Sequence, residues 1–343
     1  MTTPAARGFR MPGEWAPHTR CWMAWPCRPE TWPEGQFDAA CQAYADVARA
    51  IADFEPVTMV CDPADVAEAS LACGPAAGGS GIQILPVPLS DSWIRDTGPS
   101  FVTDGRGGLA GVHWGFNAWG GNYAECGKDR EVGRLVLEHL ELERFRAPLV
   151  MEGGSFHVDG EGTLITTEQC LLNPNRNPHL SRDEIERHLK DHLGVSTIIW
   201  LGGGYQDDET DGHIDEIACF VRPGVVLALT TDDPADANFK VFQDNLDRLS
   251  RARDAQGRTL EVIPLPQPAR RDENGVRLTL SYTNLYIANG GVVAPSFEDP
   301  RDDEAFRILR KAFPDREVIQ IPALDIVRGG GGIHCITQQQ PAP

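Results

Sequence analysis

Residues 181–224 read SRDEIERHLKDHLGVSTIIWLGGGYQDDETDGHIDEIACFVRPG. Ser181 and Glu184 have the spacing of a capping box, and apolar residues then recur at helical intervals from Ile185. A short β-rich run and a hairpin follow, at residues 197–201 and at residues 214–221 with a turn at 222–224. The segment therefore predicts one helix–strand–hairpin unit.

The same order of signals recurs along the chain. Further helices are predicted at residues 36–54, 128–140, 237–249 and 302–313. Further short strands that follow a helix are predicted at residues 57–60, 82–87, 260–264 and 318–321. Hairpins are predicted where a strand runs into a turn: residues 94–103 before a turn at 104–108, residues 155–158 before a turn at 159–162, and residues 279–288 before a turn at 289–291. A last hairpin strand is predicted at residues 333–338, near the end of the chain.

About five such units indicate a repeat architecture, since a fixed order of elements is typical of propellers and solenoids. Residues 21–25 would supply the missing partner of residues 333–338, and their pairing would close a ring. No linker rich in Ser, Gly or Pro divides the chain, and residues 72–81 are interpreted as a glycine-rich surface loop. We therefore expect a single α/β domain over residues 1–343.

Composition limits the classes of partner. The 343 residues carry 31 Lys plus Arg against 50 Asp plus Glu, a formal net charge of −19. Such a charge disfavours nucleic acid and anionic membranes and favours small cations. No signal peptide or apolar run of the roughly 18 residues that a membrane span needs is visible, so a cytoplasmic protein is expected. The nine cysteines include no C-x-x-C pair, which argues against a disulfide framework and a zinc site.

Isolated reactive groups occupy similar positions in these units. Asp96 opens one predicted hairpin, Glu152 precedes the next, His213 and Asp215 open a third, and Cys335 lies in the last. If the units surround a common axis, three carboxylates, one imidazole and one thiol converge near its centre. This combination provides a nucleophile, an acid/base partner and a site for a cation.

The sequence His213-Ile-Asp215 is the sharpest local signal, because side chains at i and i+2 of a strand share one face. We therefore expect the imidazole and the carboxylate to be neighbours; an ordinary surface pair is the alternative. The preceding acidic run, residues 207–212, resembles a calcium loop, but Ala218 stands where the closing Glu should be. A solvated acidic loop is the simpler interpretation.

Cys335 follows four glycines, residues 329–332, which would let backbone approach a ligand beside the thiol. A buried inert cysteine is the alternative, and it is preferred for the other eight. His334 would point to the opposite face of a strand and is interpreted as structural. Trp93 and Trp119 are candidates to stack on a planar cation, although such residues more often simply pack in a core.

A guanidinium fits these groups. It is planar and permanently charged, and its donors suit two carboxylates, here Asp96 with Asp215 or Glu152. Its carbon would then face Cys335. A bound cation and a protonated His213 would favour the thiolate at neutral pH.

Several motifs closely resemble the agmatine-hydrolysing members of the bacterial-type peptidylarginine deiminase family, among the guanidine-modifying enzymes. They are Trp93-Ile-Arg-Asp-Thr-Gly-Pro99, Glu152-Gly-Gly154, Asp208-Glu-Thr-Asp-Gly-His-Ile-Asp215, Gly330-Gly-Gly-Ile-His-Cys335, Asn173-Pro-Asn-Arg-Asn-Pro-His179 and Tyr286-Ile-Ala-Asn-Gly-Gly291. The resemblance extends over nearly the whole chain. It implies a five-bladed, pseudo-symmetric α/β propeller, or pentein, with a central active site.

The resemblance also implies a reaction. Cys335 would be the nucleophile and His213 the general acid/base, while Asp96, Glu152 and Asp215 would hold the guanidinium and orient His213. Agmatine would pass through an S-alkylthiouronium intermediate to N-carbamoylputrescine and ammonia, without cofactor or metal, in the formation of putrescine. A homo-oligomer, dimer or tetramer, is likewise implied.

Two residues depart from the family pattern, in which Asn commonly stands at the positions of Gly332 and Glu216. Neither change removes a catalytic group, but both lie beside the expected pocket. The further candidate contacts of the substrate are Trp93, Trp119, Gly331 and, for the amine of its tail, Glu209, Asp211 and Glu216.

Four alternatives stay open from the sequence. In the first, a related deiminase acts on arginine or peptidyl-arginine. Free arginine would need a positive residue to bind its carboxylate, and Arg95 is the candidate within the motifs, but the acidic surroundings argue against this substrate. Transfer of the amidino group to an amine is the second, and a non-catalytic binder of polyamines or guanidines is the third. The fourth, a cysteine peptidase, is disfavoured because three carboxylates would suit an oxyanion poorly.

Overall fold

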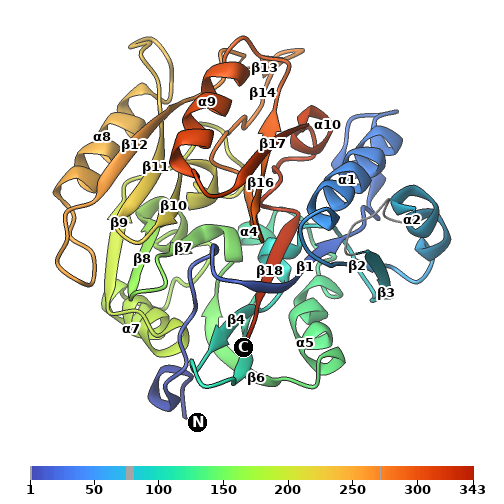
Figure 1. Cartoon of the computed structure of the whole chain (residues 1–343), viewed down its shortest axis with the longest axis horizontal. Helices are drawn as coiled ribbons and strands as arrows, with labels where there is room; N and C mark the ends of the chain where they lie inside the picture. The colour runs from blue at the N-terminus through green and yellow to red at the C-terminus, as the bar shows by residue number, and fades with distance from the viewer. Residues whose placement is uncertain (1, 75–80, 271) are drawn as a thin grey trace.

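The computed structural model describes residues 2–74, 81–270 and 272–343; most of the glycine-rich loop predicted over residues 72–81 lies outside this part. The described strands form five sheets of similar build and one small hairpin. In each of these five sheets an antiparallel pair is extended by a third, parallel strand (Figure 1).

Four sheets have three strands each, in the order of the chain. They are β4 (Ser100–Thr103), β5 (Leu109–Gly115) and β6 (Glu143–Val150); β7 (Phe156–Val158), β8 (Thr163–Thr167) and β9 (Thr197–Leu201); β10 (Ala218–Arg222), β11 (Val225–Thr230) and β12 (Glu261–Pro266); β15 (Tyr286–Ala288), β16 (Gly291–Ser296) and β17 (Glu317–Pro322). The small hairpin is β13 (Asp272–Glu273) with β14 (Val276–Arg277).

The remaining sheet joins the two ends of the chain. Its order is β18 (Thr337–Pro341), β1 (His18–Ala24), β2 (Val57–Cys61) and β3 (Ile82–Pro86). Cys21 pairs with Gln339 and Met23 with Thr337 in antiparallel register. The predicted pairing of the first strand with the last is therefore confirmed.

Longer helices lie on the outside of the sheets (Figure 1). They are α1 (Phe37–Ala52), α2 (Val66–Cys73), α5 (Asp129–His139), α7 (Arg182–Leu193), α8 (Phe239–Arg251) and α9 (Asp302–Ala312). All except α2 were predicted from apolar periodicity, and α7 begins with the expected capping box of Ser181 and Glu184. Each buries an apolar face, such as Cys41, Tyr44, Ala48 and Ile51 of α1.

Short helical turns occupy the segments that carry the site, and here three predicted strand starts are wrong. Residues 94–97 form α3 (Ile94–Thr97), residues 214–216 form η4 (Ile214–Glu216), and residues 333–336 form a turn before β18. In two of these turns a threonine hydroxyl donates to the carbonyl four residues earlier, Thr97 to Trp93 at 3.2 Å and Thr337 to Ile333 at 2.9 Å. These bonds favour a turn over an extended chain.

The other short helices are η1 (Ala5–Arg7), η2 (Pro29–Thr31), α4 (Ala118–Gly121), η3 (Gly153–Ser155), α6 (Glu168–Leu171) and α10 (Leu324–Val327). The predicted strand at residues 279–288 is also shorter, since only β15 is extended. In the part of the chain that the structure describes, no helix combines the length and the apolar character needed to cross a bilayer.

Candidate active site

A cavity of about 210 Å³ lies where α3, η4 and the turn before β18 meet. Eight of the ten predicted site residues line it: Trp93, Asp96, Trp119, Glu209, His213, Asp215, Gly331 and Cys335. Further lining residues are Arg28, Glu30, Thr31, Asp91, Asn122, Tyr123, Thr210, Glu216, Gly329 and Gly330. Glu152 and Asp211, the two remaining predictions, are not among the lining residues.

Cys335 is 7% exposed and lies in the turn that precedes β18. Its Sγ is 3.2 Å from the Asn284 Nδ2 and 3.6 Å from a carboxylate oxygen of each of Asp215 and Glu216. Burial, together with the charges of Asp215 and Glu216, raises the pKa of the thiol well above its usual value. A cation beside the sulfur would oppose this effect and favour the thiolate.

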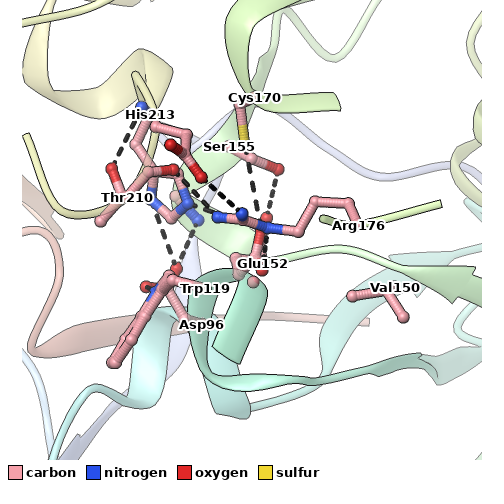
Figure 2. Close-up of polar contacts among 12 residues, drawn as sticks. Asp96, Trp119, Val150, Glu152, Ser155, Cys170, Arg176, Thr210 and His213 are labelled. Carbon is pink, nitrogen blue, oxygen red and sulfur yellow. Dashed lines mark hydrogen bonds and ion pairs between the residues drawn. The ribbon is translucent and has the colours of Figure 1, made fainter. Parts of the chain in front are cut away.

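His213 is buried between two carboxylates (Figure 2). Its Nδ1 is 3.9 Å from an Asp96 oxygen, and its Nε2 is 3.6 Å from a Glu152 oxygen. Although burial lowers it, the pKa of His213 is raised well above its usual value, first by the charge of Asp96 and further by Cys170 and Glu152. The imidazole is therefore suited to hold a proton and donate it to a leaving group.

Asp96 is fixed by two donors. The indole Nε1 of Trp119 donates to one oxygen at 2.9 Å (Figure 2). The backbone N–H of Gly154 donates to the other oxygen at 2.8 Å. Burial, with added repulsion from Asp215 and Glu152, raises the pKa of Asp96. Trp119 thus orients a carboxylate in addition to forming part of the wall.

Glu152 lies behind His213 and forms an ion pair with Arg176, with 2.8 Å between its oxygen and the Arg176 Nε. Both side chains are fully buried. Against the effect of burial, His213 and Arg176 lower the pKa of Glu152. The expectation that Glu152 grips the guanidinium directly is corrected, because its carboxylate contacts His213 and Arg176 and does not line the cavity.

Asp215 is held from the side opposite to the cavity. His334 Nδ1 is 2.8 Å from one Asp215 oxygen, and His334 Nε2 is 3.0 Å from Glu14. Against the effect of burial, the hydrogen bond and charge of His334 lower the pKa of Asp215. The structural role expected for His334 agrees with this position, but the strand argument behind it fails, since His334 and Cys335 contact the same Asp215 oxygen.

The strand argument fails for His213-Ile-Asp215 as well, because residues 214–216 form a 3-10 turn. Both side chains line the cavity, but His213 pairs with Asp96 and Glu152, and Asp215 pairs with His334. The two side chains are therefore neighbours, as expected, since a Cβ on Gly154 would lie 2.7 Å from the His213 Nδ1 and 2.8 Å from an Asp215 oxygen, but each has its own partners.

Gly331 makes room for the site. A Cβ at this position would lie 2.7 Å from the ring of Trp93 and 3.0 Å from the Cβ of Cys335. Gly154 is similarly restricted, since its Cβ would lie 2.7 Å from the Nδ1 of His213. Backbone without side chains therefore approaches both the thiol and the imidazole.

The remaining charges of the cavity are mostly negative. Glu209 lines the cavity; its side chain as a whole is exposed, and partial desolvation of its carboxylate, with repulsion from Asp208, raises its pKa. Arg28 also lines the cavity, ion-paired with Glu30 at 3.4 Å and with Asp91 at 4.0 Å. The sequence argument on counter-charges did not consider Arg28, which lies within ion-pair distance of these two carboxylates.

Asp211 has another role than the one expected. Its carboxylate accepts hydrogen bonds of 2.8 Å from Asn175 Nδ2 and Arg176 Nη1. The expected contact of Asp211 with the amine of the substrate is thus corrected to a contact with the arginine behind His213. Glu216, also expected near that amine, lies instead against the thiol.

Sequence reasoning did not assign Arg176, Glu14 or Asn284. Arg176 lies inside the quoted motif Asn173–His179, where one arginine among three asparagines was a signal that could have been followed. Nothing local marks Glu14, which precedes β1 and reaches His334 over a sequence separation of 320 residues.

In the described part of the chain, three groups of side chains have the composition of a metal site: Glu14, His157 and His334; Glu152, Cys170 and His213; Asp215, Glu216 and Cys335. In the first two a guanidinium already supplies the positive charge, since Arg95 is 3.2 Å from Glu14 and Arg176 is 2.8 Å from Glu152. The third opens on the cavity and suits an organic cation.

Comparisons with known structures place the fold. Agmatine deiminase of Enterococcus faecalis superposes with a TM-score of 0.96 at 38% identity, over 100% of this chain and 98% of that chain. DDAH from Pseudomonas aeruginosa superposes with a TM-score of 0.52 at 15% identity, over 94% and 99%. The chain therefore has the mixed α/β fold that these two enzymes share.

Sequence comparison defines the family. The profile of the Porphyromonas-type peptidyl-arginine deiminases matches residues 10–341. Agmatine deiminase of Stutzerimonas stutzeri is 50% identical over 365 aligned positions, which cover 100% of this chain and 98% of that protein. The chain belongs to the Porphyromonas-type peptidyl-arginine deiminase family.

Proposed function

We propose that this chain is an agmatine deiminase, which hydrolyses the guanidinium of agmatine to N-carbamoylputrescine and ammonia. The observation that carries the proposal is the placement of the Cys335 thiol 3.6 Å from Asp215 in one cavity with His213. The relatives from Stutzerimonas stutzeri and Enterococcus faecalis are both named agmatine deiminase, and each aligns with 100% of this chain. The product would enter putrescine synthesis.

In the proposed mechanism Asp96 and Asp215 bind the planar guanidinium, and Glu209 meets the primary amine of the tail. Two carboxylates supply the acceptors that a guanidinium requires. Asp96 is oriented by Trp119 and Gly154, and Asp215 by His334. Because these carboxylates are already oriented, they hold the guanidinium carbon at the Cys335 sulfur and do not have to rearrange during the reaction.

Cys335 then attacks the guanidinium carbon, and the protonated His213 donates its proton to the leaving nitrogen. Ammonia departs and an S-alkylthiouronium remains on Cys335. The neutral His213 next takes a proton from water and the resulting hydroxide adds to the same carbon. The sulfur then leaves as a thiolate, and the O–H proton of the adduct passes to solvent, which gives the ureido carbonyl. Glu152 acts on His213 and is a positioning residue, since it pairs with the imidazole at 3.6 Å.

The architecture proposed with this function is a single domain over residues 1–343, with five blades around the site. It is supported by five sheets of the same order and by the pairing of β1 with β18. A homo-oligomer, dimer or tetramer, is part of the proposal by resemblance alone. Light scattering on the purified protein tests it, and a monomeric mass would contradict it.

The test of the function is product formation from agmatine, arginine and a peptidyl-arginine in parallel, with ammonia and the ureido product both measured. Turnover of agmatine alone, abolished in Cys335→Ala, is the expected result. Preference for arginine would assign another substrate to the same chemistry. Binding of agmatine without any turnover would replace the deiminase with a binding protein.

A further inference from the structure

Glu216 is a buried carboxylate of the cavity that the mechanism above does not use. One of its oxygens accepts a 2.8 Å hydrogen bond from the Asn284 Nδ2 and lies 3.6 Å from the Cys335 Sγ. The other oxygen has no hydrogen-bond partner among the residues that the structure describes. An ionisable group placed against the nucleophile in this way is a candidate for proton transfer.

The thiol must lose a proton before it attacks, and its contacts limit where that proton can go. Among the residues that the structure describes, three side chains lie within hydrogen-bonding range of Sγ: Asn284, Asp215 and Glu216. Asn284 presents its amide nitrogen, which is a donor. The imidazole of His213 faces Asp96 and Glu152 instead. The acceptor is therefore one of the two carboxylates.

The two carboxylates lie equally far from the sulfur but differ in basicity. The Asp215 oxygen that faces Sγ also receives a 2.8 Å hydrogen bond from His334, an imidazole whose pKa is raised by Glu14 and Asp215 against burial and the charge of Arg95. The Glu216 oxygen receives one bond from a neutral amide. A carboxylate with fewer and weaker donors binds a proton more tightly. The pKa directions agree, since that of Asp215 is lowered and that of Glu216 is raised.

We propose that Glu216 accepts the proton of the Cys335 thiol when the guanidinium is bound. The inference rests on the proposed function, because it concerns the first step of the same reaction. The S–H bond breaks, an O–H bond forms on Glu216, and the electron pair of sulfur forms the bond to the guanidinium carbon. His213 protonates the leaving nitrogen as before, and Glu216 returns its proton when the sulfur later departs as a thiolate.

A pH dependence follows from this role. The titratable groups that act on Glu216 are Asp215 on its own turn, Asp208 and His213 from the preceding segment, and Cys335 from the turn before β18. Burial, then Asp215 and Asp208, raise the pKa of Glu216. Since the ionised form is the base, kcat/KM falls as the pH drops through this raised pKa. The acid limb of the profile belongs to Glu216.

The isosteric variant Glu216→Gln tests the proposal on the full chain through two rates that should move in opposite directions. Without the base, kcat/KM for agmatine falls by about 100-fold or more, and the acid limb disappears. Without the negative charge, which raises the pKa of the thiol, alkylation of Cys335 by iodoacetamide at pH 7 becomes faster. Cys335→Ala identifies the part of the alkylation that belongs to this thiol.

Two variants complete the design. Glu216→Asp keeps a carboxylate, so it retains the acid limb at reduced kcat, which separates loss of the base from loss of packing. Glu209→Gln removes a cavity carboxylate away from the sulfur, so it changes KM and leaves the alkylation rate unchanged.

Unchanged or faster deimination by Glu216→Gln would overturn the proposal, and so would slower deimination together with slower alkylation. Absence of agmatine turnover in the unmodified protein would instead remove the proposed function.

Discussion

Arg176 and Glu152 form a fully buried ion pair, 2.8 Å between Nε and the carboxylate oxygen, on the side of His213 that faces away from the cavity. Neither residue lines the cavity. The pair fixes the charge beside the imidazole without competing for the substrate. It links the segment 173–179 to the chemistry of residues that lie far away in the sequence.

Breaking this pair should destabilise the protein. Arg176→Met leaves the Glu152 carboxylate buried without its partner, so the free energy of unfolding should fall by about 3–5 kcal/mol. Urea unfolding at pH 7 measures the loss. The matched control is Arg251→Met. Its ion pair with Asp247 lies on the surface, with 80% and 69% of the two side chains exposed, and should contribute about 0–1 kcal/mol. Equal losses in the two variants would contradict the importance of burial here.

Glu152→Gln should move the alkaline limb of the kcat profile to lower pH. The charges of Asp96 and Glu152 raise the pKa of His213, and activity is lost as the pH rises through that pKa because the acid form donates the proton. Removing the charge of Glu152 lowers the pKa of His213, so the loss of activity begins at a lower pH. Glu168→Gln, a surface carboxylate, serves as control, and an unmoved limb in Glu152→Gln would argue against His213 as the acid.

Gly331→Ala should lower activity because its Cβ has no room. The added carbon would lie 2.7 Å from the Trp93 ring, and overpacking of this kind costs about 1–3 kcal/mol. We expect a fall in kcat/KM of at least about tenfold, measured with agmatine at saturating and limiting concentrations. Gly127→Ala is the matched control, since its Cβ would meet nothing within 4 Å. Full activity of Gly331→Ala would show that the cavity wall tolerates displacement.

Glu209→Gln should raise KM for agmatine without changing kcat. The lost attraction is between exposed charges, so the change should be about two- to fivefold. Butylguanidine, which has no tail amine, should be turned over equally by both proteins. Asp207→Asn, an exposed neighbour outside the cavity, is the control. The same KM effect with butylguanidine would remove Glu209 from its role at the amine.

Elements set by local pattern were predictable from the sequence, and elements set by distant contacts were not. The capping box of Ser181 and the apolar face of α7 lie within one segment, and that helix forms as predicted. The turns around Asp96 and Asp215 resemble strand starts locally. The turn at Asp96 is held by the local bond of Thr97 and also by distant ones, such as that from Arg95 N–H to the Cys335 carbonyl. Tertiary contacts of this range leave no periodicity in the sequence.

The site shows the same limit. Spacing and chemistry identified Cys335, His213, Asp96 and Asp215, which meet in one cavity. They could not distinguish Glu152 from the carboxylates of the cavity, because its partner Arg176 comes from another segment. Nor could they place Glu216, whose position depends on where Asn284 and the turn before β18 meet.

The central claim is covalent catalysis by Cys335, and rapid acid quenching followed by mass spectrometry tests it most directly. Within the first turnovers with agmatine, the peptide that contains Cys335 should gain the mass of agmatine less ammonia, and ammonia should be released before the ureido product. Cys335→Ala should show neither the adduct nor turnover. An adduct on a different cysteine, or turnover of agmatine by Cys335→Ala, would contradict the account.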